Sequence, residues 1–90
     1  MKEIKDKTLL ITGGTGSFGN AVLNRFLNTD HFKEIRIFSR DEKKQDEQRR
    51  RLSDPKVKFY IGDVRDPLSI ETAMRGVDYV FHAAALKQVP

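Results

Sequence analysis

A glycine-rich turn between an apolar run and a helical pattern is the feature that most limits what this chain can fold into. Residues 12–19 read Thr-Gly-Gly-Thr-Gly-Ser-Phe-Gly. Strand-forming residues 8–11 precede this turn, and residues 21–27 follow it with helical spacing of apolar side chains. Glycines let the backbone bend tightly and approach a phosphate, and the unpaired N–H groups of the first helical turn point at that phosphate. The pattern therefore predicts a nucleotide cofactor as well as a strand-turn-helix unit.

Glycine-rich turns also occur in two settings that have no dinucleotide. An ordinary tight turn uses glycines, but the flanking strand and helix favour a phosphate-binding turn. A P-loop ends in Gly-Lys-Ser/Thr, whereas Gly19 is followed by Asn20 and Ala21. The cofactor-binding residues predicted in this segment are Gly13, Thr15, Gly16, Ser17, Phe18 and Gly19.

Composition and charge exclude several classes of protein. Ninety residues suit one small domain, and the chain has no cysteine for disulfides or thiolate metal sites, so we expect no metal. No apolar run approaches a membrane span, and residues 1–7 are too charged for a signal-peptide core, so we expect a cytoplasmic protein with no membrane partner. The net charge of +4 invites a nucleic-acid partner. Because aromatic residues do not interleave with the cations, we expect instead a solvated surface with a few cations for an anionic cofactor.

Four strand-like runs alternate with helical patterns along the chain. Strands are expected at residues 8–12, 34–39, 57–61 and 78–82, and helices from Ser17, over residues 41–52, and from Pro67 with Asp66 as its cap and Gly76 at its exit. This alternation predicts βαβ units in an α/β fold with a parallel, Rossmann-type sheet. Right-handed crossovers give the strand order 3-2-1-4. The first and fourth strands then part at their carboxyl ends, where open α/β sheets bind ligands.

The three expected helices differ in their apolar content. Apolar stripes are expected to form from Phe18, Val22 and Phe26 in the first helix and from Ile70, Ala73 and Met74 in the third. The second helix is nearly all polar, and its opposite-charge pairs at four-residue spacing add only about 0.2–0.5 kcal/mol each. We therefore expect it to be the least firmly held element.

The tip of the second strand determines which dinucleotide fits. Ser39 and Arg40 stand about twenty residues after the last glycine of the turn, where an acidic residue would bind the ribose diol of NAD. A small hydroxyl residue followed by arginine fits the 2′-phosphate of NADP instead. With Lys43 and Lys44 close behind, we predict NADP. Asp41 keeps NAD open, because a shift of one residue would aim its carboxylate at the ribose.

Two further segments border the predicted ligand site. After the third strand, Asp63 is predicted to accept a hydrogen bond from the adenine amino group, with Val64 packed beside the ring. Near the end of the fourth strand we expect His82 to be buried and hydrogen-bonded. The small residues that are predicted to let the cofactor lie close to the backbone are Ala83, Ala84 and Ala85. Lys87 is predicted near the nicotinamide ribose and the substrate, with an ordinary surface lysine as the alternative.

These motifs resemble the N-terminal part of an extended short-chain dehydrogenase/reductase. The turn fits the pattern TGxxGxxG through Thr12, Gly13, Gly16 and Gly19. Segments 38–42, 61–66 and 82–90 are similar to those of bacterial nucleotide-sugar 4,6-dehydratases that act on UDP-N-acetylglucosamine in surface polysaccharide or glycan biosynthesis. The resemblance covers essentially the whole chain, and segment 82–90 is its most discriminating part.

The resemblance implies an NADP-dependent lyase with a nucleotide-sugar substrate of the UDP-N-acetylglucosamine class. Hydride leaves C4 of the sugar, water is eliminated across C5 and C6, and hydride returns to C6, and some members also invert C5. A homo-oligomer is implied for the full-length enzyme. The Tyr-x-x-x-Lys pair that moves the C4 hydroxyl proton lies downstream in such enzymes and does not occur in this sequence.

We therefore expect residues 1–90 to form an NADP-binding Rossmann half-domain. This fragment would lack the substrate domain and catalytic residues, so that it would be inactive alone, and its fourth strand would be an open edge. Two alternatives remain open for the function. One is a sugar-nucleotide epimerase or reductase of the same superfamily, and the other is a non-catalytic NADP-binding regulatory module.

Overall fold

One parallel sheet organises the part of the chain that the computed structural model describes, residues 4–83. Its strands are β1 (Lys7–Thr12), β2 (Phe32–Ser39), β3 (Val57–Ile61) and β4 (Tyr79–His82). Their order in the sheet is β3-β2-β1-β4, and all three neighbouring pairs are parallel. This arrangement confirms the Rossmann-type order 3-2-1-4 expected from right-handed crossovers.

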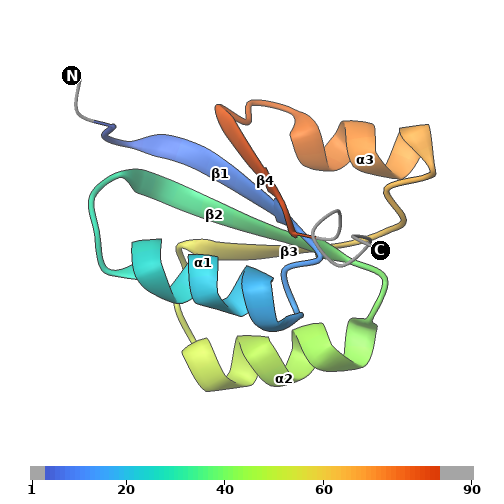
Figure 1. The fold of residues 1–90 in the computed structure, drawn as a ribbon, viewed down its shortest axis with the longest axis horizontal. Coiled ribbons are helices and arrows are strands. Elements are labelled where there is room, and N and C mark those ends of the chain that lie inside the picture. The colour runs from blue at the N-terminus through green and yellow to red at the C-terminus, as the bar shows by residue number, and fades with distance from the viewer. Residues whose placement is uncertain (1–3, 84–90) are drawn as a thin grey trace.

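Helices cover both faces of the sheet (Figure 1). The helices α1 (Ser17–Leu27) and α2 (Glu42–Leu52) lie on one face, and α3 (Pro67–Met74) lies on the other. The start of α3 is as expected, because the Asp66 side chain accepts a hydrogen bond from the Leu68 N–H at 3.1 Å. Its exit also agrees, since Gly76 has a φ of +76°. Within residues 4–83, no helix is long and apolar enough to cross a membrane.

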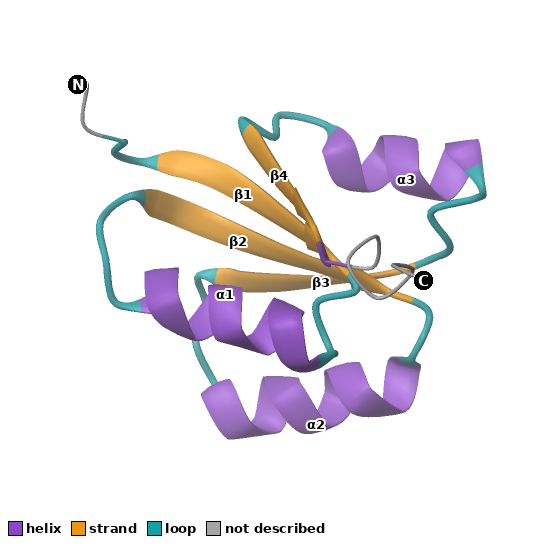
Figure 2. Ribbon diagram, in the orientation of Figure 1, coloured by secondary structure: helices purple, strands orange, loops and turns teal. Residues whose placement is uncertain are grey.

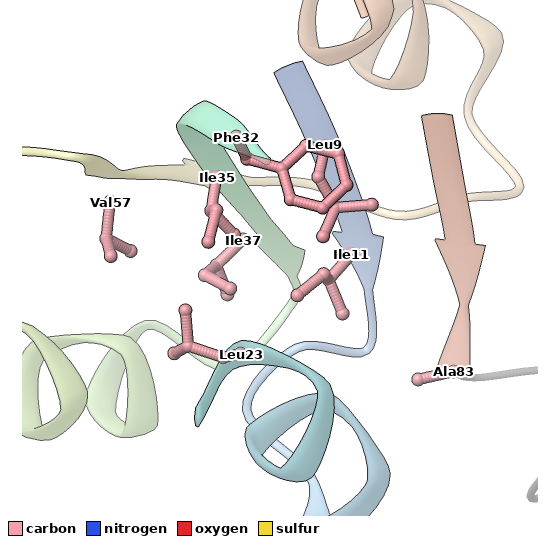
Figure 3. Close-up of a cluster of buried hydrophobic side chains, with 8 residues drawn as sticks. All are labelled: Leu9, Ile11, Leu23, Phe32, Ile35, Ile37, Val57 and Ala83. Carbon is pink, nitrogen blue, oxygen red and sulfur yellow. The ribbon is translucent and has the colours of Figure 1, made fainter. Parts of the chain in front are cut away.

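The hydrophobic core consists of one cluster on each face of the sheet. The larger cluster lies on the face of the sheet that α1 covers. Its buried residues are Leu9, Ile11, Leu23, Phe32, Ile35, Ile37, Val57 and Ala83 (Figure 3). The smaller one lies under α3 and contains Leu10, Phe38 and Ala73. Because both faces are covered, consecutive residues of β1 are buried although their side chains point to opposite sides.

The apolar stripes of α1 and α3 differ from the expected ones at two positions. Leu23 is the fully buried apolar residue of α1, whereas Phe18 is 52% exposed. In the first turn of this helix, Gly19 is the residue that packs against the glycine turn, at Gly13 and Gly14. The side chain of the neighbouring Phe18 therefore points away from the core. Met74 is 42% exposed because it is the last residue of the short helix α3, and Ala73 takes the buried position.

The polar helix α2 is anchored in a way that its charge pattern does not predict. Gln45 and Gln48 are 1% and 4% exposed, so two amide side chains occupy the face that packs on the sheet. The Asp41 side chain caps the helix by accepting a hydrogen bond from the Lys44 N–H at 2.9 Å. Hydrogen bonds from the glutamines therefore take the place of the apolar contacts that hold α1.

The strand β4 lies at one edge of the described sheet, as expected. Tyr79 and Val80 are each nearly half exposed, because a neighbour covers only one side of the strand. Asp78 precedes the strand, and its carboxylate accepts a hydrogen bond from the Thr8 N–H at 2.9 Å. This contact fixes the start of β4 against β1.

Candidate functional site

The loops that follow β1, β2 and β3 gather at the same end of the sheet (Figure 2). The first of them is the glycine turn, in which Gly13 has a φ of +68° and donates from its N–H to the Phe38 carbonyl at 2.8 Å. The turn closes with a hydrogen bond of 3.1 Å from the Gly16 N–H to the Gly13 carbonyl. These bonds hold the turn against the tip of β2, so two of the predicted binding segments are neighbours.

The amino end of α1 differs from those of the other helices. Gly16 is its N-cap, and among the residues that the structure describes no side chain caps it. In contrast, Asp41 caps α2 and Asp66 caps α3. Ser17 and Phe18, the first residues of α1, are exposed. The first N–H groups of this helix are thus available to an anion, and the helix dipole favours negative charge there.

Gly19 brings α1 into direct contact with the glycine turn. A Cβ atom at this position would lie 2.4 Å from Gly14 Cα and 2.7 Å from the Gly13 carbonyl oxygen. Any side chain would therefore push the helix away from the end of β1. Gly14, which was not among the predicted cofactor-binding residues, is equally confined, since its Cβ would lie 2.6 Å from Ile37 Cγ2. Both glycines serve close packing.

Side-chain amides hold the glycine turn by its carbonyl groups. Asn20 Nδ2 donates to the carbonyls of Thr15, at 3.3 Å, and Gly16, at 3.1 Å. Gln48 Nε2 donates to the Gly14 carbonyl at 3.2 Å and to Asn20 Oδ1 at 2.8 Å. The acceptors of the turn are satisfied by these donors, and the amides at the start of α1 remain for a ligand.

A depression of about 580 Å³ joins the glycine turn to the tip of β2. Its lining residues are Thr15, Ser39, Arg40, Asp41, Glu42 and Lys44. Lys43 lines a different depression of about 340 Å³, together with Asp46 and Arg49. Consecutive residues of a helix point in directions about 100° apart, which separates Lys43 from Lys44. The structure thus brings together most of the residues that were predicted to choose the dinucleotide, but not Lys43.

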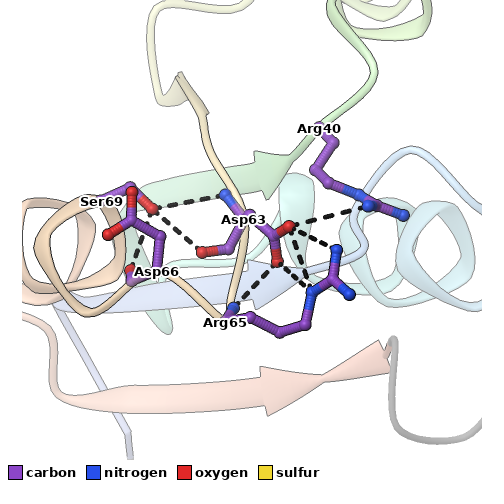
Figure 4. A network of polar contacts seen from close by, with 5 residues as sticks. All are labelled: Arg40, Asp63, Arg65, Asp66 and Ser69. Carbon is purple, nitrogen blue, oxygen red and sulfur yellow. Dashed lines mark hydrogen bonds and ion pairs between the residues drawn. The ribbon is translucent and has the colours of Figure 1, made fainter.

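Beyond the end of β3, the Asp63 carboxylate faces the guanidinium groups of both Arg40 and Arg65 (Figure 4). The carboxylate is 2.9 Å from Arg65 Nη2 and 3.6 Å from Arg40 Nη1, and it also accepts a hydrogen bond from the Arg65 backbone N–H at 2.9 Å. The side-chain hydrogen bond from Arg65, followed by the backbone one, lowers the pKa of Asp63 from 3.8 to about 2. Asp63 is therefore an ionised acceptor at neutral pH, and Val64 beside it is 39% exposed.

The end of β4 differs from expectation in its burial. His82 Nδ1 is hydrogen-bonded to Thr12 Oγ1, but the residue is exposed rather than buried, because β4 is an edge strand. Ala83 is fully buried, and its methyl group packs in the larger core cluster on the face of the sheet that α1 covers. Three residues that were predicted to border the cofactor, Ala84, Ala85 and Lys87, lie outside the described residues.

Sequence reasoning missed the three amide side chains that organise this end of the molecule, namely Asn20, Gln45 and Gln48. For the two glutamines, the sequence did contain a sign of burial. Gln45 and Gln48 stand three residues apart in a helix whose other polar residues are all charged. Uncharged amides at that spacing share one face of a helix and tolerate burial when they are hydrogen-bonded.

Comparison with known sequences relates the chain to one family. A family model described as "Polysaccharide biosynthesis protein" matches residues 9–90. Proteins named UDP-glucose 4-epimerase from Rickettsia akari and Rickettsia bellii are 76% and 75% identical over 88 residues. These matches cover 94% of this chain and 26% of each relative. The chain thus spans about a quarter of the length of these curated relatives.

Solved structures share the same architecture. The X-ray structure of Pen from Bacillus thuringiensis superposes with a TM-score of 0.87 at 39% identity and covers 98% of this chain, which corresponds to 28% of that chain. An NADPH-bound carbonyl reductase from chicken fatty liver gives a TM-score of 0.68 at 20% identity over 84% of this chain and 35% of that one. The second likeness establishes the fold alone.

Proposed function

The chain belongs to the polysaccharide biosynthesis protein family, and we propose that it is the NADP-binding part of an enzyme that acts on a UDP-sugar through C4 of the sugar ring. One observation carries this proposal. The side chains of Ser39, Arg40 and Lys44 line one depression together with Thr15, which belongs to the glycine turn that leads into the uncapped amino end of α1. Open α/β sheets bind dinucleotides at this place.

The glycine turn is the proposed pyrophosphate site. The N–H groups of Ser17 and Phe18 stand at the positive end of the α1 dipole, and a pyrophosphate is an anion that such amides bind without a cation. Gly13 and Gly16 shape the turn, and Thr15 borders the depression. The carbonyls that would repel a phosphate are engaged by Asn20 and Gln48.

Three donors favour NADP over NAD. Ser39, Arg40 and Lys44 surround the depression beside the turn, and a 2′-phosphate offers only acceptor oxygens to them. The carboxylate that would favour NAD belongs to Asp41, and one of its oxygens accepts the Lys44 N–H as the cap of α2, which orients the side chain towards that helix. At the other end of the adenosine, the ionised Asp63 would accept from the adenine amino group, with Val64 against the ring.

When bound, the nicotinamide supplies reversible hydride transfer at C4. The role of this chain is to hold the adenosine and phosphate groups, which orients the reactive ring relative to the sugar. The proposed proton-moving Tyr-x-x-x-Lys pair does not occur in residues 1–90, so we assign it to sequence outside them.

Two reactions are consistent with this role. The names of the curated relatives favour a 4-epimerase, which inverts C4 of UDP-glucose and was one of the alternatives left open by the sequence. Segments 38–42, 61–66 and 82–90 resemble those of UDP-N-acetylglucosamine 4,6-dehydratases, which also oxidise C4 but then eliminate water. We place the epimerase first because of the 76% identity, and we keep the dehydratase as the second candidate.

The products separate the two reactions. The intact protein that carries this chain is incubated with NADP and either UDP-glucose or UDP-N-acetylglucosamine, and the products are analysed by mass spectrometry and proton NMR. An epimerase gives a product of unchanged mass with an inverted C4 proton coupling, whereas a dehydratase gives a product lighter by one water. An intact protein that binds the dinucleotide but converts neither sugar would overturn the enzymatic proposal and support a regulatory module.

A further inference from the structure

Two glutamines with nearly complete burial are the least expected feature of α2. Gln45 and Gln48 are 1% and 4% exposed, while the other residues of this helix are charged except Leu52. Burying an amide is unfavourable unless it is hydrogen-bonded. Among the described residues, the Oε1 atoms of both glutamines are buried without a hydrogen-bond partner. A helix that only covered a sheet would gain more from apolar side chains at these two positions, so a second role must be considered.

The hydrogen-bond partners fix how each amide is oriented. Gln45 Nε2 donates to the Tyr60 carbonyl at 2.8 Å and to Ser39 Oγ at 3.0 Å. A carbonyl oxygen only accepts, so the atom that faces Tyr60 must be the nitrogen. The same nitrogen therefore faces Ser39, whose hydroxyl oxygen acts as the acceptor. The hydroxyl hydrogen of Ser39 is then left to point at a different acceptor.

The direction of the Ser39 hydroxyl determines what it can bind. Ser39 lines the depression next to Arg40 and Lys44. A hydroxyl that donates into this depression matches a phosphate oxygen, which only accepts. The ribose hydroxyl of NAD both donates and accepts hydrogen bonds. It therefore gains less binding energy than a phosphate does from a Ser39 hydroxyl that is fixed as a donor.

We propose that Gln45 is a positioning residue for dinucleotide specificity, because it fixes Ser39 as a hydrogen-bond donor toward a phosphate on the ribose. This inference rests on the proposed function and deepens it, since it names the group that gives the serine its preference. Gln45 is 1% exposed and does not line the depression, so its proposed effect on the cofactor passes through Ser39.

Gln48 provides a matched control within the same helix. It is the same residue type with similar burial, but its amide nitrogen donates to the Gly14 carbonyl and to Asn20 Oδ1. These contacts support the glycine turn, which is common to all adenine dinucleotides. Loss of the Gln48 hydrogen bonds should therefore affect NADPH and NADH alike.

The test compares two reduced cofactors on the same preparations of the intact protein. The dissociation constants of NADPH and NADH are measured by nicotinamide fluorescence for the wild type and for Gln45→Met, Gln48→Met, Ser39→Ala and the double variant Ser39→Ala/Gln45→Met. Ser39→Ala removes a hydrogen bond to a charged group and should weaken NADPH by about tenfold. Gln45→Met should weaken NADPH by up to that factor, because Ser39 loses its fixed orientation, and should weaken NADH by less than about twofold. Gln48→Met should weaken both cofactors by the same factor.

The double variant shows whether Gln45 works through Ser39. If it does, Gln45→Met changes nothing further once Ser39 is alanine. The ratio of the two dissociation constants does not depend on how much of a preparation is folded. If Gln45→Met does not fold, Gln45→Leu replaces it, because its side chain is also apolar and of similar size and it likewise removes the hydrogen bond to Ser39.

The outcomes separate the inference from the function on which it rests. A wild type that binds neither cofactor, or that prefers NADH, contradicts the proposed NADP site. A wild type that prefers NADPH and keeps its preference in the Gln45 variants overturns the positioning role alone. Equal weakening of both cofactors by Gln45→Met would also overturn it, because that result describes a purely structural residue.

Discussion

Arg36 Nη1 donates a hydrogen bond of 2.9 Å to the carbonyl oxygen of Ala73, which ties the strand β2 to the last turn of α3. The same nitrogen donates to the Arg75 carbonyl at 2.6 Å, and Glu34 pairs with the guanidinium at 2.5 Å. The centroid of the Tyr60 ring lies 5.5 Å from the guanidinium carbon of Arg36. A strand side chain thus satisfies carbonyls that the end of a helix leaves unpaired.

Replacing Arg36 should therefore loosen α3. Arg36→Met keeps much of the side-chain volume but leaves the helix carbonyls and Glu34 without a donor, so we expect a loss of about 2 kcal/mol in the free energy of unfolding. Urea denaturation of the intact protein measures this loss. Arg75→Ala is the control, because its side chain is 77% exposed and should change stability by less than about 0.5 kcal/mol. Equal effects of the two substitutions would contradict the role of Arg36.

Gly19→Ala distinguishes helix propensity from close packing. Propensity alone predicts that alanine stabilises a helix by about 1 kcal/mol relative to glycine. The structure predicts the opposite sign, because a Cβ would lie 2.4 Å from Gly14 Cα. We expect a destabilised protein that binds NADPH at least about tenfold more weakly, since the α1 amides move away from the turn. Thermal unfolding and cofactor titration check both effects, with the exposed position Asn24→Ala as the control.

The ion pair at Asp63 predicts a specific dependence on pH. The pKa of this carboxyl is about 2 in the folded protein and 3.8 when it is unperturbed. A lowered folded-state pKa stabilises the protein above the unperturbed value, and this contribution is lost as the pH falls from about 4 towards 2. Carbon-detected NMR titration should place the Asp63 midpoint near 2 and move it towards 3.8 in Arg65→Ala. A midpoint unchanged by this substitution would show that the Arg65 side chain is not the main cause.

Arg40 and Lys43 offer a paired test of the 2′-phosphate site. Arg40 lines the depression beside Ser39, whereas Lys43 lines another one. Arg40→Ala should weaken NADPH by about tenfold or more and leave NADH nearly unchanged, as expected for the loss of a charge-assisted hydrogen bond. Lys43→Ala should affect neither cofactor by more than about twofold. An Arg40→Ala variant with full NADPH affinity would make the assignment wrong.

The fold was accessible from the sequence because its signals are local. Strand-like runs alternate with helical segments, and the handedness of βαβ crossovers then leaves one order for the strands. The ends of α3 were also readable, since Asp66, Pro67 and Gly76 each act on the backbone within one or two residues, Asp66 through its side chain and the other two through their own φ angles. Such features need no knowledge of distant contacts.

The remaining details depend on contacts between segments far apart in the chain. Gln48 reaches Gly14 across 34 positions, and Arg36 reaches Ala73 across 37, and neither contact leaves a periodic pattern in the sequence. The separation of Lys43 from Lys44 follows from the rotation of α2 about its axis, which Gln45 and Gln48 fix. Sequence reasoning thus found the segments of the candidate site but not the side chains that hold them in place.

The most direct test of the account is a crystal structure of the intact protein with NADP bound. We predict that the pyrophosphate accepts hydrogen bonds from the backbone N–H groups of Ser17 and Phe18, and that the 2′-phosphate lies within hydrogen-bond distance of Ser39 and Arg40. A structure in which the dinucleotide binds elsewhere and these groups contact only water would contradict the account.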